Sequence, residues 1–251
     1  MIRKATPDDW HSISDISRRS GYEDYINRTG SSYLEEGEVL LYEDGSIKAF
    51  SKIEYLPDHS VWFSGLRVDP DYWRSGIGQK LSEASLKFGT EKGCTTARLL
   101  VYDDNARSLG LVEKLGFRMV GKYNFIYGTP NLEDFDTVEV ALDQGLINLG
   151  WKFMEASKAH PVKASLHSFN EWRILETREK TFEILHTGKP ISLSGKEGFT
   201  CARSSMDLPE TVHNYTELDI SSGFVLEKAL NPTPHPDRWN RSISSHLGCN
   251  D

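Results

Sequence analysis

The chain has 251 residues, of which 38% are apolar and 26% charged, a composition that suits a globular protein with a buried core. Its net charge is −8, and residues 1–145 carry most of it, with 17 Lys and Arg against 24 Asp and Glu. This acidic balance argues against a nucleic-acid partner and is compatible with a cationic amine substrate. No apolar run approaches the roughly 18–20 residues of a membrane span, so we expect no membrane association.

The start of the chain and its cysteines indicate a compartment. The stretch MIRKATPDDW lacks the apolar core of a signal peptide. Cys94, Cys201 and Cys249 are widely spaced and odd in number, so they do not make a disulfide framework. We therefore expect a cytoplasmic protein.

Hydrophobic patterns and turn residues predict the elements of residues 1–145. In chain order these are a strand at 2–6, a helix from 7 to about 19, a hairpin over 38–56, a strand at 60–68, a helix from 77 to about 93, a strand at 95–102, a helix at 105–115, and strands at 117–128 and 135–142. Thr6 is the expected N-cap of the first helix, and Asp44-Gly45 the turn of the hairpin. This order predicts an α/β (α+β) fold, a mixed and mostly antiparallel sheet flanked by helices, with strand 135–142 completing the set.

The residue pattern of the sequence changes after about residue 145. The later segment alternates like strands and turns, and its last 20 residues are rich in Pro, Ser and Asn. We therefore expect two units, residues 1–145 and a smaller, β-containing accessory domain at 146–251 that covers the acceptor site or forms a homodimer interface.

A short stretch between a strand and a helix carries the most specific signal. PDYWRSGIGQKL, residues 70–81, places Gly76 and Gly78 where the next helix begins. A helix N-terminus offers unpaired N–H groups and a partial positive charge, which suit a phosphate. No Lys-Ser/Thr pair follows Gly78 as in a P-loop, and Leu81 stands where a dinucleotide fingerprint has its third glycine.

Two motifs together resemble a known family. LRVDPDYWRSGIGQKL, followed about 27 residues later by NARSLGLVEKLGF, resembles the two signature motifs of the GNAT acyl-CoA-dependent N-acetyltransferases. The resemblance covers roughly residues 1–145. It implies an enzyme that moves an acetyl group from acetyl-CoA to a primary amine, on a small molecule or a protein, by direct transfer. No metal is expected, because His235, His246 and Cys249 do not supply ligands at the spacing of a zinc finger.

The resemblance also implies where the coenzyme lies. The pyrophosphate would rest on backbone N–H groups of the glycine turn, with Gly76 and Gly78 expected at positive φ. The pantetheine arm would meet the backbone of the preceding strand, and the N-cap residue of the second helix would either touch the arm or act as a cap only. The expected coenzyme-binding residues are Leu66, Val68, Trp73, Arg74, Ser75, Gly76, Ile77, Gly78, Gln79 and Asn105.

Three positions depart from the family pattern. Trp73 replaces the usual Gln or Arg, and Arg74 stands where glycine is common. Val112 occupies the position of the tyrosine that serves as general acid in many relatives. We therefore expect other proton carriers: Glu54 or Asp103 as base, and Tyr123, Tyr102 or Tyr127 as acid. The alternative is an acyl-CoA-binding sensor or interaction module without catalysis, which Val112 favours.

Overall fold

A computed structural model of the chain describes residues 1–21, 25–126, 132–170, 172–179, 181–186, 189–194, 200–203 and 221–231. The helices are α1 (Trp10–Arg19), α2 (Tyr25–Thr29), α3 (Ile77–Glu91) and α4 (Ala106–Lys114), with 3-10 turns at Pro7–Asp9, Gly30–Leu34 and Pro70–Tyr72. The strands are β1 (Ile2–Lys4), β2 (Glu38–Asp44), β3 (Ser46–Tyr55), β4 (Ser60–Val68), β5 (Thr96–Tyr102), β6 (Arg118–Ile126), β7 (Asp136–Leu142), β8 (Gly145–Leu149), β9 (Lys152–Ala156), β10 (Val162–Phe169), β11 (Trp172–Thr177), β12 (Thr181–His186), β13 (Lys189–Ser194), β14 (Thr200–Arg203) and β15 (Ser221–Ala229). In these described ranges, none of the helices has the length and apolar character to cross a bilayer.

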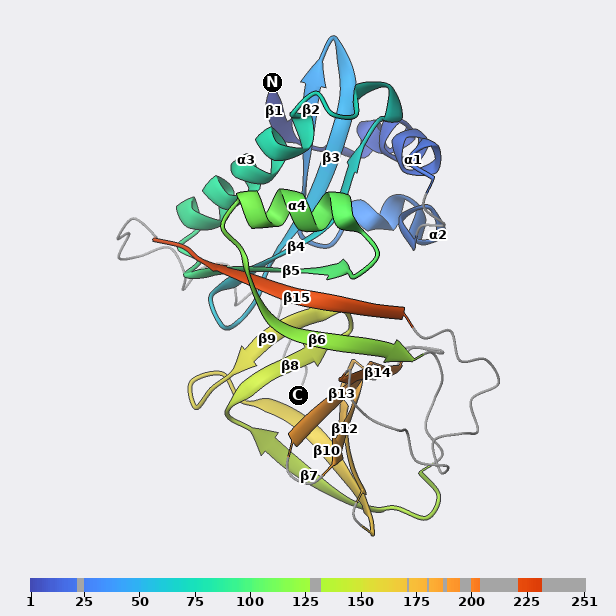
Figure 1. Ribbon diagram of the computed structural model, residues 1–251, viewed down its shortest axis with the longest axis vertical. Coiled ribbons are helices and arrows are strands. Elements are labelled where there is room, and N and C mark those ends of the chain that lie inside the picture. Colours follow the sequence, from blue (N-terminus) through green and yellow to red (C-terminus); the bar gives the residue numbers. More distant parts are fainter. Residues whose placement is uncertain are drawn as a thin grey trace, which may run out of the picture.

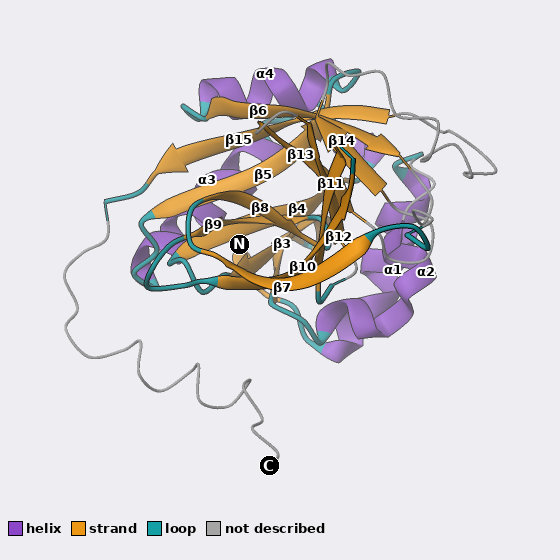
Figure 2. Ribbon diagram, turned by 90° about the horizontal axis from the view of Figure 1, so that it is seen from below, coloured by secondary structure: helices purple, strands orange, loops and turns teal. Residues whose placement is uncertain are grey.

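The main sheet has eight strands in the order β1-β2-β3-β4-β5-β15-β6-β14, and helices cover both of its faces (Figure 1). Along β3, Ala49 and Ile53 pack into the core beneath α3 and α4, whereas Phe50 packs against α1 and α2. Successive side chains of a strand point to opposite faces, so the two helix pairs lie on opposite sides of the sheet. In the view from below, α4 and the α1–α2 pair flank the strands (Figure 2). The mixed, mostly antiparallel sheet flanked by helices is thus confirmed.

The last strand of the main sheet differs from the expectation. The prediction that strand 135–142 completes this sheet is wrong, because β7 pairs with β10 in a second sheet of order β13-β12-β11-β10-β7. β15 instead lies between β5 and β6 and pairs antiparallel with both. Residues 127–220 are therefore inserted in the chain between two neighbouring strands of the main sheet, and they include β14, which pairs with β6 at the edge of that sheet. An alternating pattern identifies a strand but does not name its partner, which explains the error.

The inserted segment packs on the main sheet. The β8–β9 hairpin places Ile147, Phe153 and Met154 in one core with Trp62 of β4 and Tyr123 of β6. The Phe153 ring centroid lies 4.7 Å from that of Tyr123. The boundary near residue 145 stays a prediction about folding units, but side-chain packing and the pairing of β15 both cross it.

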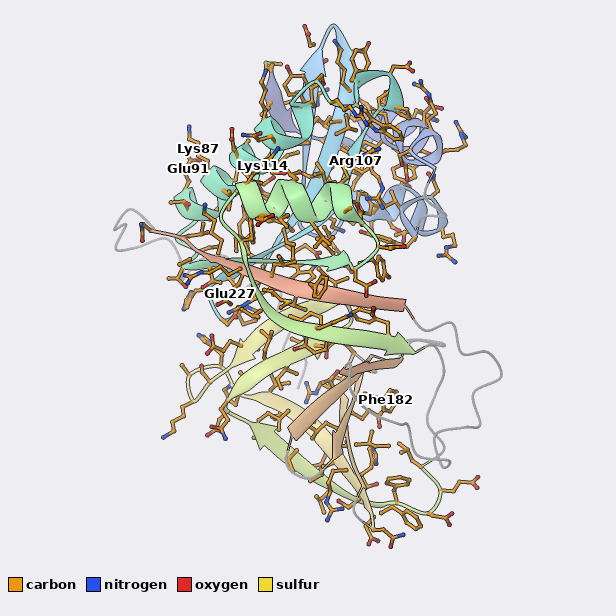
Figure 3. The ribbon with its side chains drawn as sticks, in the orientation of Figure 1. Lys87, Glu91, Arg107, Lys114, Phe182 and Glu227 are labelled. Atoms are coloured by element: carbon orange, nitrogen blue, oxygen red, sulfur yellow. The ribbon has the colours of Figure 1, made fainter. Side chains whose placement is uncertain are left out.

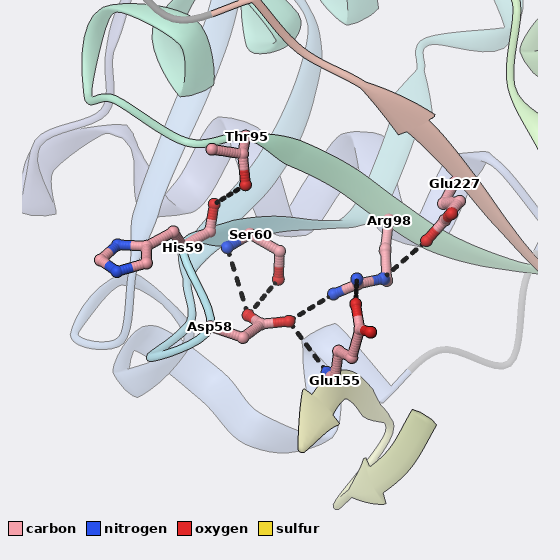
Figure 4. A network of polar contacts seen from close by, with 7 residues as sticks. All are labelled: Asp58, His59, Ser60, Thr95, Arg98, Glu155 and Glu227. Atoms are coloured by element: carbon pink, nitrogen blue, oxygen red, sulfur yellow. Dashed lines mark hydrogen bonds and ion pairs between the residues drawn. The ribbon is translucent and has the colours of Figure 1, made fainter. Parts of the chain in front are cut away.

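An ion cluster around the buried Arg98 side chain joins these parts (Figure 4). Arg98 of β5, whose side chain is 3% exposed, lies 2.5 Å from Asp58, 3.1 Å from Glu227 of β15 and 3.4 Å from Glu155 of β9. The Asp58 carboxylate also accepts the backbone N–H of Glu155 at 2.9 Å. Burial alone would raise the pKa of Asp58, but hydrogen bonds from Ser60 and the Glu155 N–H, with the charge of Arg98, lower it. The cluster thus connects β5, the β3–β4 loop, the hairpin and β15.

Candidate active site

We call residues 73–79 the glycine turn. It follows the 3-10 turn Pro70–Tyr72 and ends in the first turn of α3, whose N-cap is Gly76 at φ 80°. Arg74 also has positive φ, 63°, which is uncommon for a residue with a side chain. No side chain caps α3, so the first N–H groups of the helix, which have no partner within it, point out of the turn. Such groups with the helix dipole suit a bound anion.

The two glycines act differently. Positive φ is confirmed at Gly76, where nothing lies within 4 Å of an added Cβ. The same expectation is wrong at Gly78, which is the second residue of α3 and is absent from the positive-φ glycines. A Cβ at Gly78 would lie 3.5 Å from Val68 and 4.0 Å from Leu66, which are ordinary contacts. Gly78 therefore brings the helix close to the end of β4.

The end of β4 separates from its neighbour. β4 and β5 pair from Ser60↔Thr96 to Phe63↔Leu99, and the described pairing stops there. On the other side, the β3–β4 register shifts between Phe50 and Lys52, and Gly65 has φ 59°, so a bulge lies at this point. From Ser64 onward β4 thus presents an open edge beside the glycine turn. The carbonyl oxygen of Val68 on β4 accepts a hydrogen bond from the Trp73 indole at 2.8 Å.

The second motif lies against the first. Asn105 caps α4, with its Oδ1 accepting the N–H of Ser108 at 3.0 Å. Two residues later, the Arg107 guanidinium lies 4.2 Å from the ring centroid of Trp73, which is 41% exposed. Arg107 projects from one end of α4 and Lys114 from the other (Figure 3). A cation over an indole face is attracted to it, so this stack holds the glycine turn to the start of α4.

The other expected coenzyme residues have local roles. Ser75 donates its hydroxyl to the Tyr72 carbonyl at 2.5 Å, and Gln79 donates to Glu83 at 2.9 Å. Ile77 is buried in the core beneath α3. The structure therefore brings the ten expected positions to the glycine turn, the end of β4 and the start of α4.

The two expected bases form separate ion pairs. Glu54 is mostly buried and forms an ion pair with Lys152 at 2.6 Å. Asp103 accepts the hydroxyl of Ser222 and lies 3.1 Å from Lys122. These two contacts lower the pKa of Asp103.

The remaining positions are the candidate general acids and Val112. Tyr123 is 3% exposed, in the core shared with β8–β9. Val112 is buried in the core beneath α4, and Tyr102 is 37% exposed. Tyr127 lies outside the described residues.

The sequence did not predict the cluster of side chains at the β4 bulge near Gly65. A Cβ at Gly65 would overlap the hydroxyl of Tyr33 and would lie 3.4 Å from that of Tyr25. Lys52, 7% exposed, donates to the Tyr33 carbonyl at 3.0 Å and lies 4.6 Å from the centroid of its ring. Burial lowers the pKa of Lys52. The mixed polarity of residues 21–37 predicted no element there, and no sequence signal placed these tyrosines against β4.

Residues 4–117 match the model of the acetyltransferase (GNAT) family. This chain carries a GNAT-family domain. The match includes the glycine turn and the start of α4 and ends before β6, so the insertion and β15 lie outside it. Within the described part of the chain, no group of three His, Cys, Asp or Glu side chains could hold a metal ion.

Curated relatives match part of the chain. The chain is 32% identical over 93 residues to the [ribosomal protein bS18]-alanine N-acetyltransferase of Escherichia coli K12, covering 37% of this chain and 60% of that one. It is 33% identical over 57 residues to thialysine N-epsilon-acetyltransferase of Bos taurus, covering 23% of this chain and 34% of that one. The chain thus spans about 60% of the E. coli relative.

Solved structures share the fold of this chain. A candidate acetyltransferase of Pyrococcus horikoshii superposes with a TM-score of 0.56 at 16% identity, covering 92% of this chain and 89% of that one. Another from Thermoplasma acidophilum has a TM-score of 0.55 at 17% identity, covering 91% and 99%. At such identity the likeness concerns the fold alone.

Proposed function

We propose that this protein is an N-acetyltransferase that moves an acetyl group from acetyl-CoA to a primary amine by direct transfer. The observation that carries the proposal is the GNAT-family glycine turn, opening α3 beside the unpaired edge of β4. A pyrophosphate fits the uncapped helix start, and an amide-containing arm fits a strand edge as an added strand would. The Cβ space at Gly76 is open, which leaves room for the phosphate oxygens.

In this proposal each part of the site has a task. The N–H groups from Arg74 to Gln79 hold the pyrophosphate, with the Arg74 charge beside them. The backbone of Leu66 and Val68 holds the pantetheine arm, and Asn105 and Trp73 border it. A backbone N–H near Leu66–Val68 meets the oxyanion that forms when the amine attacks.

The acceptor is an amine that must lose a proton before attack, since an ammonium of pKa ~10 is no nucleophile. We propose Glu54 or Asp103 as its base and keep Tyr123 as a candidate acid. The lowered pKa of Asp103 makes its carboxylate a weak base at neutral pH. The E. coli relative acts on an alanine of a ribosomal protein, so a protein N-terminal amine joins small amines as a candidate acceptor. We propose a cytoplasmic enzyme that acts as a monomer or a homodimer, without a nucleic-acid or membrane partner.

A panel of amines tests the proposal. Purified protein is mixed with acetyl-CoA and each amine, including a peptide that begins with alanine, and the released thiol is measured. We expect release with at least one amine and a calorimetric signal for acetyl-CoA alone. Absence of coenzyme binding would refute the assignment.

The buried Val112 favours a second candidate, an acyl-CoA-binding sensor without catalysis. A valine cannot donate a proton to the leaving sulfur. Binding of acetyl-CoA without thiol release for any amine would support the sensor. Turnover above the uncatalysed rate would exclude it.

A further inference from the structure

We propose that Tyr33, in place of Tyr123, is the general acid of this site and donates its phenolic proton to the sulfur that leaves the thioester. The inference rests on the proposed acetyl transfer and names a residue that the two motifs do not contain. Tyr33 lies in the 3-10 turn Gly30–Leu34, on the face of the sheet that α1 and α2 cover, and its hydroxyl touches β4 at Gly65.

The path of the coenzyme arm along β4 leads to this hydroxyl. From the glycine turn the open edge runs back through Val68 and Leu66 to the bulge at Gly65. Just beyond it, Phe63 pairs with Leu99, and β4 and β5 come together. An arm laid on this edge from the pyrophosphate must therefore end near Gly65, where the strands close. The thioester lies at that end of the arm.

Glycine at position 65 leaves space for the hydroxyl. With a Cβ there, the Tyr33 hydroxyl would be displaced, and the Tyr25 hydroxyl would lie 3.4 Å from the added atom. Two phenols thus converge on one point of β4. Tyr25 is 46% exposed, whereas Tyr33 is 1% exposed, so Tyr33 is the fixed member and Tyr25 faces the solvent from which an acceptor arrives.

Packing holds the Tyr33 ring in place. Its edge contacts are with Phe50, at 6.3 Å between centroids, and Tyr25, at 6.1 Å. Lys52 donates to its backbone carbonyl and lies over its ring face. A catalytic acid needs this kind of fixed geometry, because proton transfer requires hydrogen-bond distance at the moment of bond breaking.

The chemical step balances. The amine nitrogen forms a bond to the thioester carbonyl carbon, and the carbon–sulfur bond breaks with its electron pair on sulfur. Sulfur takes the proton of the Tyr33 phenol, and the phenolate takes up the proton that the acceptor nitrogen releases. The products are the amide and the coenzyme thiol, with the enzyme unchanged. Val112, at the family position of the acid, is apolar and packs beneath α4, so it cannot perform this step.

The test compares Tyr33→Phe with Tyr55→Phe, a control on β3 whose hydroxyl donates to Glu38 at 3.3 Å, away from Gly65. The acceptor is the amine found in the panel, or hydroxylamine as a small general nucleophile. We expect kcat to fall about 100-fold in Tyr33→Phe, within the range for loss of a general acid. The calorimetric affinity for acetyl-CoA and the melting temperature should stay near wild type, and Tyr55→Phe should keep its rate. An unchanged kcat in Tyr33→Phe overturns the inference.

A second readout on the wild-type protein does not depend on the variant folding. With ¹³C-labelled tyrosine, the Cζ resonance of Tyr33, assigned through its contact with Phe50, should shift when acetyl-CoA is added. Saturation with coenzyme and no shift at Tyr33 refutes the inference while leaving the proposed function intact. Absence of coenzyme binding refutes both.

Discussion

The indole N–H of Trp73 donates a hydrogen bond to the carbonyl oxygen of Val68, with 2.8 Å between the nitrogen and the oxygen. This bond fastens the glycine turn to the open end of β4. It links the two elements that our proposal assigns to the pyrophosphate and to the pantetheine arm. Loss of this hydrogen bond should therefore lower both the free energy of unfolding and the affinity for the coenzyme.

Trp73→Phe removes this donor and keeps a ring on which Arg107 can stack. A single neutral hydrogen bond contributes about 0.5–1.5 kcal/mol net, so we expect the free energy of unfolding in urea to fall by about 1 kcal/mol. The matched variant Arg107→Ala removes the stack and keeps the hydrogen bond. If Trp73→Phe is as stable as wild type, the indole bond contributes nothing net.

Two substitutions at Gly78 distinguish the effect of an added side chain from the effect of an added negative charge. Gly78→Ala should fold and gain up to about 1 kcal/mol, because its Cβ meets only ordinary contacts and alanine favours helix. Gly78→Asp places a carboxylate in the first turn of α3, which suits the helix dipole but repels a pyrophosphate. We expect Gly78→Asp to stay folded and to bind acetyl-CoA at least ~10-fold more weakly, a loss of about 1.4 kcal/mol. Calorimetry that finds equal affinity in Gly78→Asp and Gly78→Ala would place the pyrophosphate elsewhere.

Arg74 combines backbone strain with a charge. Its φ of 63° is in the left-handed region, which costs a residue with a Cβ about 1–2 kcal/mol. Arg74→Gly should relieve that strain, offset by the greater entropy that glycine loses, for a net gain of at most about 1 kcal/mol. It should also weaken coenzyme binding and reduce the dependence of affinity on salt. Arg74→Lys, which keeps charge and strain, is the control. Greater affinity in Arg74→Gly than in Arg74→Lys would contradict a role for the charge.

Local features of the fold were predictable because their causes are local. The turn dipeptide Asp44-Gly45, the cap at Asn105 and the apolar stripe of residues 77–88 each specify an element through neighbours in sequence. The glycine turn was predictable because its spacing resembles a family motif.

Features that depend on distant segments could not be predicted. The position of β15 depends on pairing with β5, about 120 residues earlier in the chain. The contact of Tyr33 with Gly65 depends on a β4 bulge that no residue pattern marks. Likewise, Glu54 and Asp103 were reasonable bases by position in sequence, but their lysine neighbours Lys152 and Lys122 come from other strands.

Asp58 should control stability in acid. Its folded pKa is lowered, so its contribution is present above the unfolded value of about 3.9 and is lost as the pH falls through the folded value. Asp58→Asn leaves Arg98 buried with one contact fewer, and breaking a buried pair costs about 3–5 kcal/mol. We expect the free energy of unfolding of Asp58→Asn to be about 3 kcal/mol below that of wild type at pH 7, and this difference to shrink below pH ~4.

The control for this prediction is Glu155→Gln, whose side chain is 66% exposed and 3.4 Å from Arg98. An exposed pair contributes about 0–1 kcal/mol, so this variant should unfold almost as wild type does. Equal denaturant midpoints for Asp58→Asn and wild type at pH 7 would show that the cluster does not stabilise the fold.

Because residues 127–220 lie between β6 and β15 in the chain, a truncation and an internal deletion should have different effects on folding. Truncation after residue 145 removes β15 and leaves β5 and β6 without the strand that joins them. Replacing residues 126–220 by Asn-Gly keeps β15. Phe125 pairs with Ser221, and a two-residue turn of this type closes an antiparallel pair. We expect the truncated chain to be aggregated and unable to bind acetyl-CoA, since it exposes two long strand edges.

The Asn-Gly variant should fold and bind acetyl-CoA, with lower stability, because removal of β8–β9 exposes Trp62, Tyr123 and the rest of their shared core. Sedimentation, circular dichroism and calorimetry distinguish the outcomes. If the chain of residues 1–145 folds and binds acetyl-CoA as the full chain does, β15 is dispensable and the division at residue 145 is a true domain boundary. If it fails while the Asn-Gly variant succeeds, the GNAT-type sheet needs its final strand from beyond the insertion. Comparing the thiol-release rate of the Asn-Gly variant with that of the full chain then measures what the inserted segment contributes to the acceptor site. Both chains contain the glycine turn, β4 and Tyr33.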